Sequence, residues 1–288
     1  MKPPPFDYHD PRSLAEALEL AARYGAEGKV LAGGQSLMPM LNFRLLSPAA
    51  LIDINRIGEI DYIREADGKL RLGALTRQRR IERSEPVCSR LPLLAEATQL
   101  IGHLPTRSRG TIGGSLAHAE PAAEYPAALL ALGGQVVARK AGAERLIAAE
   151  DFFVGHLTTS LAPEEILTEV RFPIPPAGSG WAFEEFNRRH GDFAVAAIAA
   201  LLVGAGGRCR KARLVAGGVG PTPIRLKAAE AILEQGRLDE AAFAEAAARA
   251  GEAVNPGSDL HASAEYRSNL TRLLTVRALR RAAERMKG

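Results

Sequence analysis

Apolar positions in the first half of the chain fall into short runs of different period. Ser13-Leu14-Ala15-Glu16 has the form of a capping box, and Leu14, Leu18 and Ala21 then lie on one helical stripe that Gly25 ends. This pattern predicts a helix over 13–25. The other elements predicted here are strands at 29–31, 51–54 and 70–74, helices at 91–101 and 127–132, and a hairpin of 135–139 with 145–148.

A strict alternation over 166–174 predicts one more strand, because Ile166, Val170 and Phe172 fall on the same face. Residues 173–180 follow with the sequence Pro-Ile-Pro-Pro-Ala-Gly-Ser-Gly, whose prolines and glycines are typical of a linker. We therefore place a domain boundary here, with a first domain over 1–177 and a second over 178–288.

The second domain has a different pattern, in which strands come first and helices follow. The predicted strands are 181–188, 194–203 and 208–216, and the predicted helices are 225–235, 240–254 and 263–286. Strands followed by helices predict an α+β fold with helices on one face of an antiparallel sheet. The arginines of the last helix spread round its axis, which favours a solvated surface over a patch for subunit contact: Arg267, Arg272, Arg277, Arg280, Arg281 and Arg285.

Composition excludes several classes of protein. The net charge is only +4, and outside the last helix there is no run of Lys or Arg, so nucleic-acid binding has no support. We find no apolar run of about 20 residues and no signal peptide, and we expect a cytoplasmic protein without an integral membrane segment. Two cysteines cannot supply the four thiolates of an iron–sulfur cluster, and six histidines show no metal-binding spacing, so no metal site is predicted.

Two glycine pairs carry the most specific chemistry. The first loop is Ala32-Gly33-Gly34-Gln35-Ser36, and the second is Thr111-Ile112-Gly113-Gly114-Ser115. Glycine allows the backbone to reach positive φ or to approach a ligand closely, and consecutive N–H groups in such a turn bind anions. Ser36 and Ser115 each add a hydroxyl donor. Two such loops could surround the diphosphate of a dinucleotide, although one Gly-Gly pair alone is more often a tight turn.

The common phosphate and nucleophile signatures are absent. Neither loop has the G-x-G-x-x-G spacing of a Rossmann domain or the G-K-[ST] of a P-loop. Ser36 and Ser115 lack the G-x-S-x-G context of a hydrolase, and we read them as donors. Glu120 and Glu124 are four residues apart, but Pro121 and Pro126 interrupt the helix that would align them, which favours acids at a helix start. We therefore predict no catalytic residue.

The residues around the glycine pairs resemble a known family. Residues 31–39, Leu-Ala-Gly-Gly-Gln-Ser-Leu-Met-Pro, and residues 109–121, Arg-Gly-Thr-Ile-Gly-Gly-Ser-Leu-Ala-His-Ala-Glu-Pro, are similar to the FAD-binding medium subunits of the molybdenum hydroxylases. Residues 189–194 and 264–267 match as well. The resemblance covers the whole chain. It implies an FAD-binding domain of the vanillyl-alcohol-oxidase type, with α/β subdomains at about 1–56 and 57–177, followed by a small C-terminal domain.

The same resemblance implies where the cofactor binds. In the family both glycine loops hold the FAD diphosphate, and they correspond to residues 32–36, with Leu37 beside them, and to residues 111–115. Ile101 and Phe193 would lie against the isoalloxazine ring, with a plain core position as the alternative for each. Many relatives carry Asp where this chain has Glu124, so Glu124 is predicted to contact FAD. The alternative for Glu124 is a solvated or helix-capping acid.

The resemblance also implies the function. The chain would take electrons from an iron–sulfur partner into FAD and pass them to an external acceptor, while a large molybdopterin subunit hydroxylates the substrate. The molybdenum cofactor and the iron–sulfur clusters would lie on these partners, within a dimer of heterotrimers. Two alternatives remain: a stand-alone FAD-dependent reductase or oxidase on the same fold, and a non-catalytic anion-binding scaffold.

Overall fold

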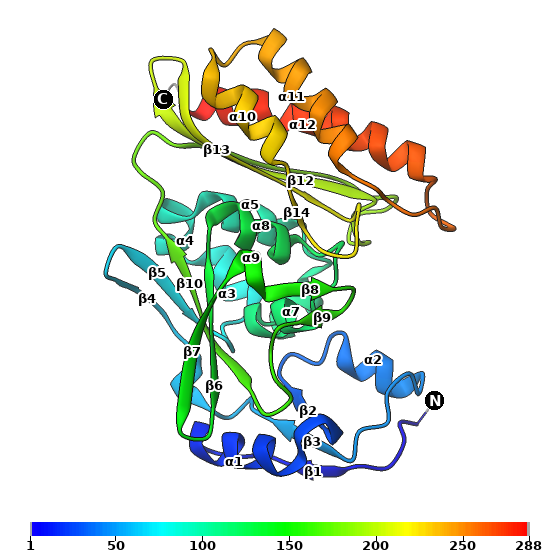
Figure 1. The fold of residues 1–288 in the computed structure, drawn as a ribbon. Coiled ribbons are helices and arrows are strands. Elements are labelled where there is room, and N and C mark those ends of the chain that lie inside the picture. Colours follow the sequence, from blue (N-terminus) through cyan, green and yellow to red (C-terminus); the bar gives the residue numbers. More distant parts are fainter. Residues whose placement is uncertain (1, 287–288) are drawn as a thin grey trace.

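The chain forms three tiers stacked along its length, as the computed structural model of residues 2–286 shows (Figure 1). A small parallel sheet lies at one end, a five-stranded antiparallel sheet occupies the middle, and a four-stranded antiparallel sheet with its helices forms the other end. Each sheet is built from a consecutive stretch of the sequence, except that β10 (Ile166–Pro173) returns to pair between β5 and β6.

The first tier is a parallel sheet in the order β1-β3-β2, packed against helix α1. Its elements are β1 (Asp7–His9), α1 (Leu14–Tyr24), η1 (Gly25–Glu27), β2 (Gly28–Leu31), α2 (Leu37–Asn42), β3 (Ala50–Asp53) and η2 (Gly58–Ile60). The predicted helix start is confirmed, because the Ser13 hydroxyl accepts a hydrogen bond from the Glu16 N–H at 3.2 Å. The chain leaves β2 directly into the first glycine loop.

The second tier is an antiparallel sheet in the order β4-β5-β10-β6-β7, with helices on one face. Its strands are β4 (Ile63–Ala66), β5 (Lys69–Gly73), β6 (Gln135–Lys140), β7 (Ala143–Ala148) and β10, with the small hairpin β8 (Phe153–Gly155) and β9 (Thr158–Thr159) beside them. Its helices are α3 (Gln78–Arg83), α4 (Glu85–Arg90), α5 (Pro92–Leu100), α6 (Leu104–Arg109), α7 (Ile112–His118), α8 (Glu124–Leu132) and α9 (Ala149–Phe152).

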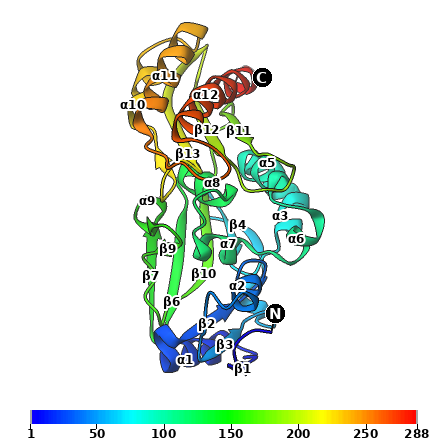
Figure 2. The ribbon, with the colours of Figure 1, turned by 90° about the vertical axis from the view of Figure 1, so that its right-hand side faces the viewer.

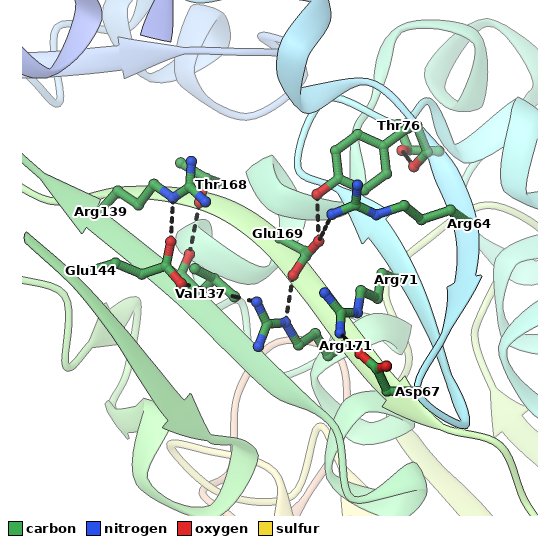
Figure 3. Close-up of polar contacts among 11 residues, drawn as sticks. Arg64, Asp67, Arg71, Thr76, Val137, Arg139, Glu144, Thr168, Glu169 and Arg171 are labelled. Atoms are coloured by element: carbon green, nitrogen blue, oxygen red, sulfur yellow. Dashed lines mark hydrogen bonds and ion pairs between the residues drawn. The ribbon is translucent and has the colours of Figure 1, made fainter. Parts of the chain in front are cut away.

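The two faces of this sheet differ in chemistry. Leu70, Leu72 and Val170 point into the core under the helices. The opposite face carries an ion-pair network, in which the buried Glu169 carboxylate lies between Arg64 and Arg171 (Figure 3). Alternation of apolar and charged residues therefore decides which face receives the helices.

The third tier matches the predicted arrangement of helices on one face of an antiparallel sheet. Its elements are β11 (Gly180–Phe186), β12 (Ala196–Ala205), β13 (Arg208–Gly217), β14 (Ile224–Arg225), α10 (Lys227–Gln235), α11 (Glu240–Ala253) and α12 (Ala264–Met286). The three helices cover the outer face of the sheet, and the inner face lies on α5 and α8 of the second tier (Figures 1 and 2). The apolar core runs through this contact, because Phe183, Ala197 and Val215 belong to the same cluster as Leu94 and Leu129.

The solvated surface predicted for the arginines of the last helix is wrong for part of the set. Arg267 is only 7% exposed and donates to the carbonyls of Val195 and Gly218 and to the Asp259 carboxylate. Arg281 pairs with Glu184 and with Glu96 of the second tier. A 23-residue helix that lies on a sheet must bury one side. Arginine is tolerated on that buried side when backbone oxygens and carboxylates accept its hydrogen bonds.

None of the helices within residues 2–286 is both long and apolar enough to span a membrane.

Candidate functional site

The fold brings the two glycine loops into direct contact. A Cβ atom added to Gly33 would lie 2.5 Å from the Arg109 carbonyl oxygen and 2.8 Å from the Gly110 Cα atom. A Cβ atom on Gly114 would lie 3.7 Å from that of Ala32. Only glycine at position 33 allows the backbone before the second loop to approach this closely. The two loops, residues 32–36 and 111–115, therefore lie against each other between the first and second tiers, and we call this contact the ridge.

The first loop has the free N–H groups expected of an anion-binding turn. Among residues 2–286, no carbonyl or side-chain oxygen accepts a hydrogen bond from the N–H groups of residues 33–37. Gly34 has φ of +71°, and the Gln35 side chain donates back to the Gly33 carbonyl at 3.3 Å. The turn then becomes helix α2 at Leu37. Successive free amides beside a positive-φ glycine form a concavity suited to phosphate oxygens.

The second loop differs from the prediction, because it is the first turn of helix α7 and its amides are already used. Thr111 is the N-cap residue, and its hydroxyl accepts from the Gly114 N–H at 3.0 Å. The Ile112 N–H donates to the Thr76 carbonyl at 3.1 Å, and that of Gly113 to the Ala74 carbonyl at 2.9 Å. The Ser115 N–H donates to the Thr111 carbonyl. The second loop thus supplies close packing, the start of a helix and the half-buried Ser115 hydroxyl, whereas the free amides belong to the first loop.

Two residues that the sequence did not single out hold the loops together. The Asn55 amide donates to the Ala32 carbonyl at 2.7 Å, and its oxygen accepts from Arg77 at 2.6 Å. Arg77 also donates to the Arg109 carbonyl. Burial and the nearby Arg109 lower the pKa of Arg77. A signal was available, because Asn55 directly follows the predicted strand at 51–54, where a polar side chain can reach the end of a neighbouring strand.

Glu124 begins helix α8 as an enclosed acid. Only 4% of the residue is exposed, so the interpretation as a solvated acid is wrong. Burial, reinforced by the charge of Glu185, raises the pKa of Glu124 to about 8. A helix start favours a carboxylate, but the loss of water outweighs that effect here.

Ile101 and Phe193 lie in segments that meet. Ile101 ends helix α5 and is buried, and two residues later His103 stacks on His190 with ring centroids 5.4 Å apart. Phe193 lies three residues beyond His190, outside β12, and 59% of it is exposed. The alternative of a plain core position is therefore wrong for Phe193, whereas Ile101 does belong to the core cluster.

Phe193 lines a cavity of about 690 Å³ between the second and third tiers. Its walls come from the residues after α7, the segment before β12 and the turns of the third tier, and they include Glu120, Pro121, Val195, Gly218 and Asp259. This volume is in the range of cavities that hold small molecules. Within residues 2–286, no three His, Cys, Asp or Glu side chains are grouped closely enough to hold a metal ion.

The residues of the ridge fit a dinucleotide cofactor. The free amides of 33–37 suit a diphosphate, and the glycine at 33 removes the side chain that would separate the loops. No lysine is needed for such a site, because backbone N–H groups alone can neutralise part of the phosphate charge.

Comparison with known proteins gives the family. Residues 4–175 match the family described as the FAD binding domain in molybdopterin dehydrogenase, and residues 181–282 match the CO dehydrogenase flavoprotein C-terminal domain. The chain is 43% identical to the 6-hydroxypseudooxynicotine dehydrogenase complex subunit alpha of Paenarthrobacter nicotinovorans, over 99% of this chain and 97% of that one. It is 37% identical to the carbon monoxide dehydrogenase medium chain of Afipia carboxidovorans, over the full length of both.

Solved structures agree with this assignment. A chain of carbon monoxide dehydrogenase from Hydrogenophaga pseudoflava superimposes with a TM-score of 0.97 at 39% identity, covering 99% of both chains. A chain of quinoline 2-oxidoreductase from Pseudomonas putida 86 gives 0.94 at 37% identity, also over 99% of both. The predicted family, fold class and cofactor are thereby confirmed. The chain belongs to the FAD-binding medium subunits of the molybdenum hydroxylases, and it is an FAD-containing oxidoreductase subunit of the carbon monoxide dehydrogenase type.

Proposed function

We propose that this subunit binds FAD on the ridge formed by the two glycine loops and carries electrons between an iron–sulfur partner and an external acceptor. The observation that supports it most directly is the row of free N–H groups at residues 33–37, held against Arg109 and Gly110. Bound FAD supplies the ability to exchange electrons, and the protein supplies binding, orientation and electrostatics.

Each predicted site residue has a proposed part in this arrangement. Residues 32–37 surround the diphosphate, and the first turn of α7, residues 111–115, closes the second side with the Ser115 hydroxyl. The exposed ring of Phe193 covers the isoalloxazine and excludes water from it. Ile101 supports the facing segment as a buried residue, and Glu124 lies beneath the cofactor as an enclosed acid. No side chain of this subunit is required to act as an acid or base on the substrate.

The proposed partners are a large molybdopterin subunit, where the substrate is hydroxylated, and a small iron–sulfur subunit, arranged as a dimer of heterotrimers. Similarity to proteins named subunit alpha and medium chain supports a multi-subunit assembly. Carbon monoxide dehydrogenase is also described as a Cu,Mo enzyme in one of the similar solved structures. The cytoplasmic location remains a prediction from the sequence.

Reconstitution of the full chain tests the FAD site first. We expect the purified chain to take up FAD, giving a visible flavin spectrum and quenched flavin fluorescence. A chain that stays colourless after FAD addition would favour the scaffold alternative. Purification of the native assembly, with analysis for FAD, iron and molybdenum, tests the partners. An isolated subunit that oxidised its own substrate at the native rate would instead establish the stand-alone reductase or oxidase.

A further inference from the structure

An open groove lined by arginines runs along helix α3, between the start of α4 and the end of α6. Its volume is about 650 Å³, and its walls include Arg77, Arg79, Arg80 and Arg83, with Glu85 as the one carboxylate among the described residues that line it. Figure 2 shows α3 and α6 on the side of the second tier away from β6 and β7. Arg79 and Arg80 lie four and three residues before Arg83, so the helix itself brings like charges together.

Two of these arginines have carboxylate partners. The Arg79 guanidinium lies 2.8 Å from the Glu82 carboxylate, which Arg107 also contacts at 3.1 Å. The Arg80 guanidinium lies 2.8 Å from the Asp61 carboxylate. Glu82 thus serves two arginines, and neither carboxylate compensates the other charges of the groove.

Arg77 and Arg83 have no counter-ion within residues 2–286. Arg77 is half-buried, and its two hydrogen-bond acceptors are neutral groups, the Asn55 amide oxygen at 2.6 Å and the Arg109 carbonyl. Burial, and then the charge of Arg109, lower the pKa of Arg77, because this cation has lost water without gaining a carboxylate. Arg83 is exposed and forms no hydrogen bond to any described residue. Buried charges in proteins are normally paired, so Arg77 favours an anion at the groove.

The chemistry of the groove suits a phosphate group. Two arginines without carboxylate partners balance a dianion, and a phosphate monoester carries about −1.5 to −2 charges at pH 7. The planar guanidinium forms paired hydrogen bonds with phosphate oxygens. The Ser84 hydroxyl, which caps no amide of α4, lines the same groove as a further donor. The groove is larger than one phosphate, and its volume is in the range of sites for small molecules.

We infer that this groove is a binding site for a phosphate group, carried by a small molecule or free in solution, and that Arg77 and Arg83 hold it. The Ser84 hydroxyl adds a donor. The site is separate from the free amides of residues 33–37, which are proposed for the FAD diphosphate.

Arg77 connects the groove to the ridge. Its guanidinium donates to the Arg109 carbonyl, the same oxygen that a Cβ atom on Gly33 would meet at 2.5 Å. It also donates to Asn55, whose amide holds the Ala32 carbonyl at 2.7 Å. A phosphate that fixes Arg77 therefore orders both loops and should raise the affinity for FAD. This coupling rests on the proposed FAD site, whereas the phosphate site itself does not.

Calorimetric titration of the full chain, in a buffer free of phosphate, tests the site. The probes are inorganic phosphate and ribose 5-phosphate, each titrated into the FAD-free chain and into the chain saturated with FAD. Arg83→Gln removes one set of charged donors and should weaken binding of both probes about tenfold. Arg210→Gln is the matched control, because it removes the same charge from an exposed arginine of β13 in the third tier and should leave binding unchanged.

The coupling is measured in the same samples. Saturating phosphate should lower the Kd for FAD about fivefold, and FAD should lower the Kd for phosphate by the same factor, because coupling between two sites is reciprocal. An FAD affinity that phosphate does not change overturns the coupling through Arg77. A chain that binds phosphate but no FAD contradicts the proposed function and leaves the phosphate site standing.

The remaining outcomes decide the site. Tighter binding of ribose 5-phosphate supports a phosphorylated small molecule, and tighter binding of inorganic phosphate supports the free ion. No binding of either probe at about 10 mM, where even a Kd of about 1 mM gives near saturation, overturns the site. Equal affinity in the wild type and Arg83→Gln does so too, as does loss of phosphate binding in the FAD-saturated chain, because the arginines would then belong to the FAD site. If circular dichroism shows that Arg83→Gln does not fold, Arg83→Lys replaces it, since lysine keeps the charge but lacks the planar donors and should still bind more weakly.

Discussion

Gly33→Ala is the most direct test of the ridge between the two glycine loops. The new methyl group would lie 2.5 Å from the Arg109 oxygen and 2.8 Å from the Gly110 Cα atom, whereas ordinary contacts begin at 3.4 Å. Both neighbours are backbone atoms. Arg77 holds the Arg109 carbonyl, and the Gln78 N–H donates to the Gly110 carbonyl at 2.9 Å. The loops must therefore separate by roughly 0.9 Å, the difference between 2.5 and 3.4 Å.

Forcing an extra methyl group into packed surroundings costs about 1–3 kcal/mol. If the folded chain relieves this strain by moving the first loop, the N–H groups of residues 33–37 lose their common direction, and the cost appears in FAD affinity. Since 1.4 kcal/mol is a factor of ten, we expect the Kd for FAD to rise by about 5- to 150-fold. If the loops resist movement, the same cost appears as lower stability.

The assay is fluorescence titration of FAD into the apo-chain, together with urea unfolding of the same sample. Gly58→Ala is the control, because a Cβ atom at Gly58 would meet nothing within 4 Å and the φ angle there is ordinary. The reasoning is refuted if Gly33→Ala matches Gly58→Ala in both FAD affinity and unfolding free energy.

Three further predictions follow from the site and its surroundings. Thr111→Val removes the cap of α7 and should lower the unfolding free energy by about 1 kcal/mol in urea titration, whereas Thr111→Ser keeps the oxygen and should cost much less. Glu124→Gln should be more stable than the wild-type apo-chain by an amount that grows as pH rises from 4.5 to about 8 and reaches roughly 5 kcal/mol. The raised pKa of Glu124 means that the folded wild type binds more protons than the unfolded chain, so the wild type loses stability over this pH range. Equal slopes of unfolding free energy against pH in both proteins would contradict this. Arg267→Gln should cost about 3 kcal/mol, since buried carbonyls and Asp259 lose their hydrogen-bond donors, while Arg280→Gln should leave the unfolding free energy nearly unchanged in the same assay because its ion pair is exposed.

The sequence predicted those parts of the fold that local pattern controls. The capping box at Ser13, the hairpin around Gly142 and the strands of the third tier follow from residue spacing alone, and the structure has them. The pattern did not predict the short helices α3, α4 and α6. These have only six residues each, too few for a helical period to be distinguished from a loop.

At the candidate site, the structure shows an arrangement of the predicted residues that the sequence pattern anticipated only in part. Gly113 and Gly114 disfavour helix locally, yet the Ala74 and Thr76 carbonyls fix the first turn of α7 through contacts distant in sequence. Phe193 continues an apolar run, but the chain turns outward before β12 and leaves the ring exposed. From the sequence alone Arg267 resembles a surface residue, because the carbonyls that accept its hydrogen bonds are brought together only by folding. Each of these outcomes depends on tertiary partners that no local pattern contains.

The shared core between the second and third tiers has a consequence for how the chain can be divided. Phe183 and Val215 pack in one cluster with Leu94 and Leu129, so a cut in the linker at 173–180 would leave an apolar surface on each fragment. The two sequence families that match the two parts of the chain therefore divide a protein that we expect to unfold as a single cooperative unit. A chimera that takes one half from a relative would therefore fold well only if the residues facing it across this contact came from the same relative.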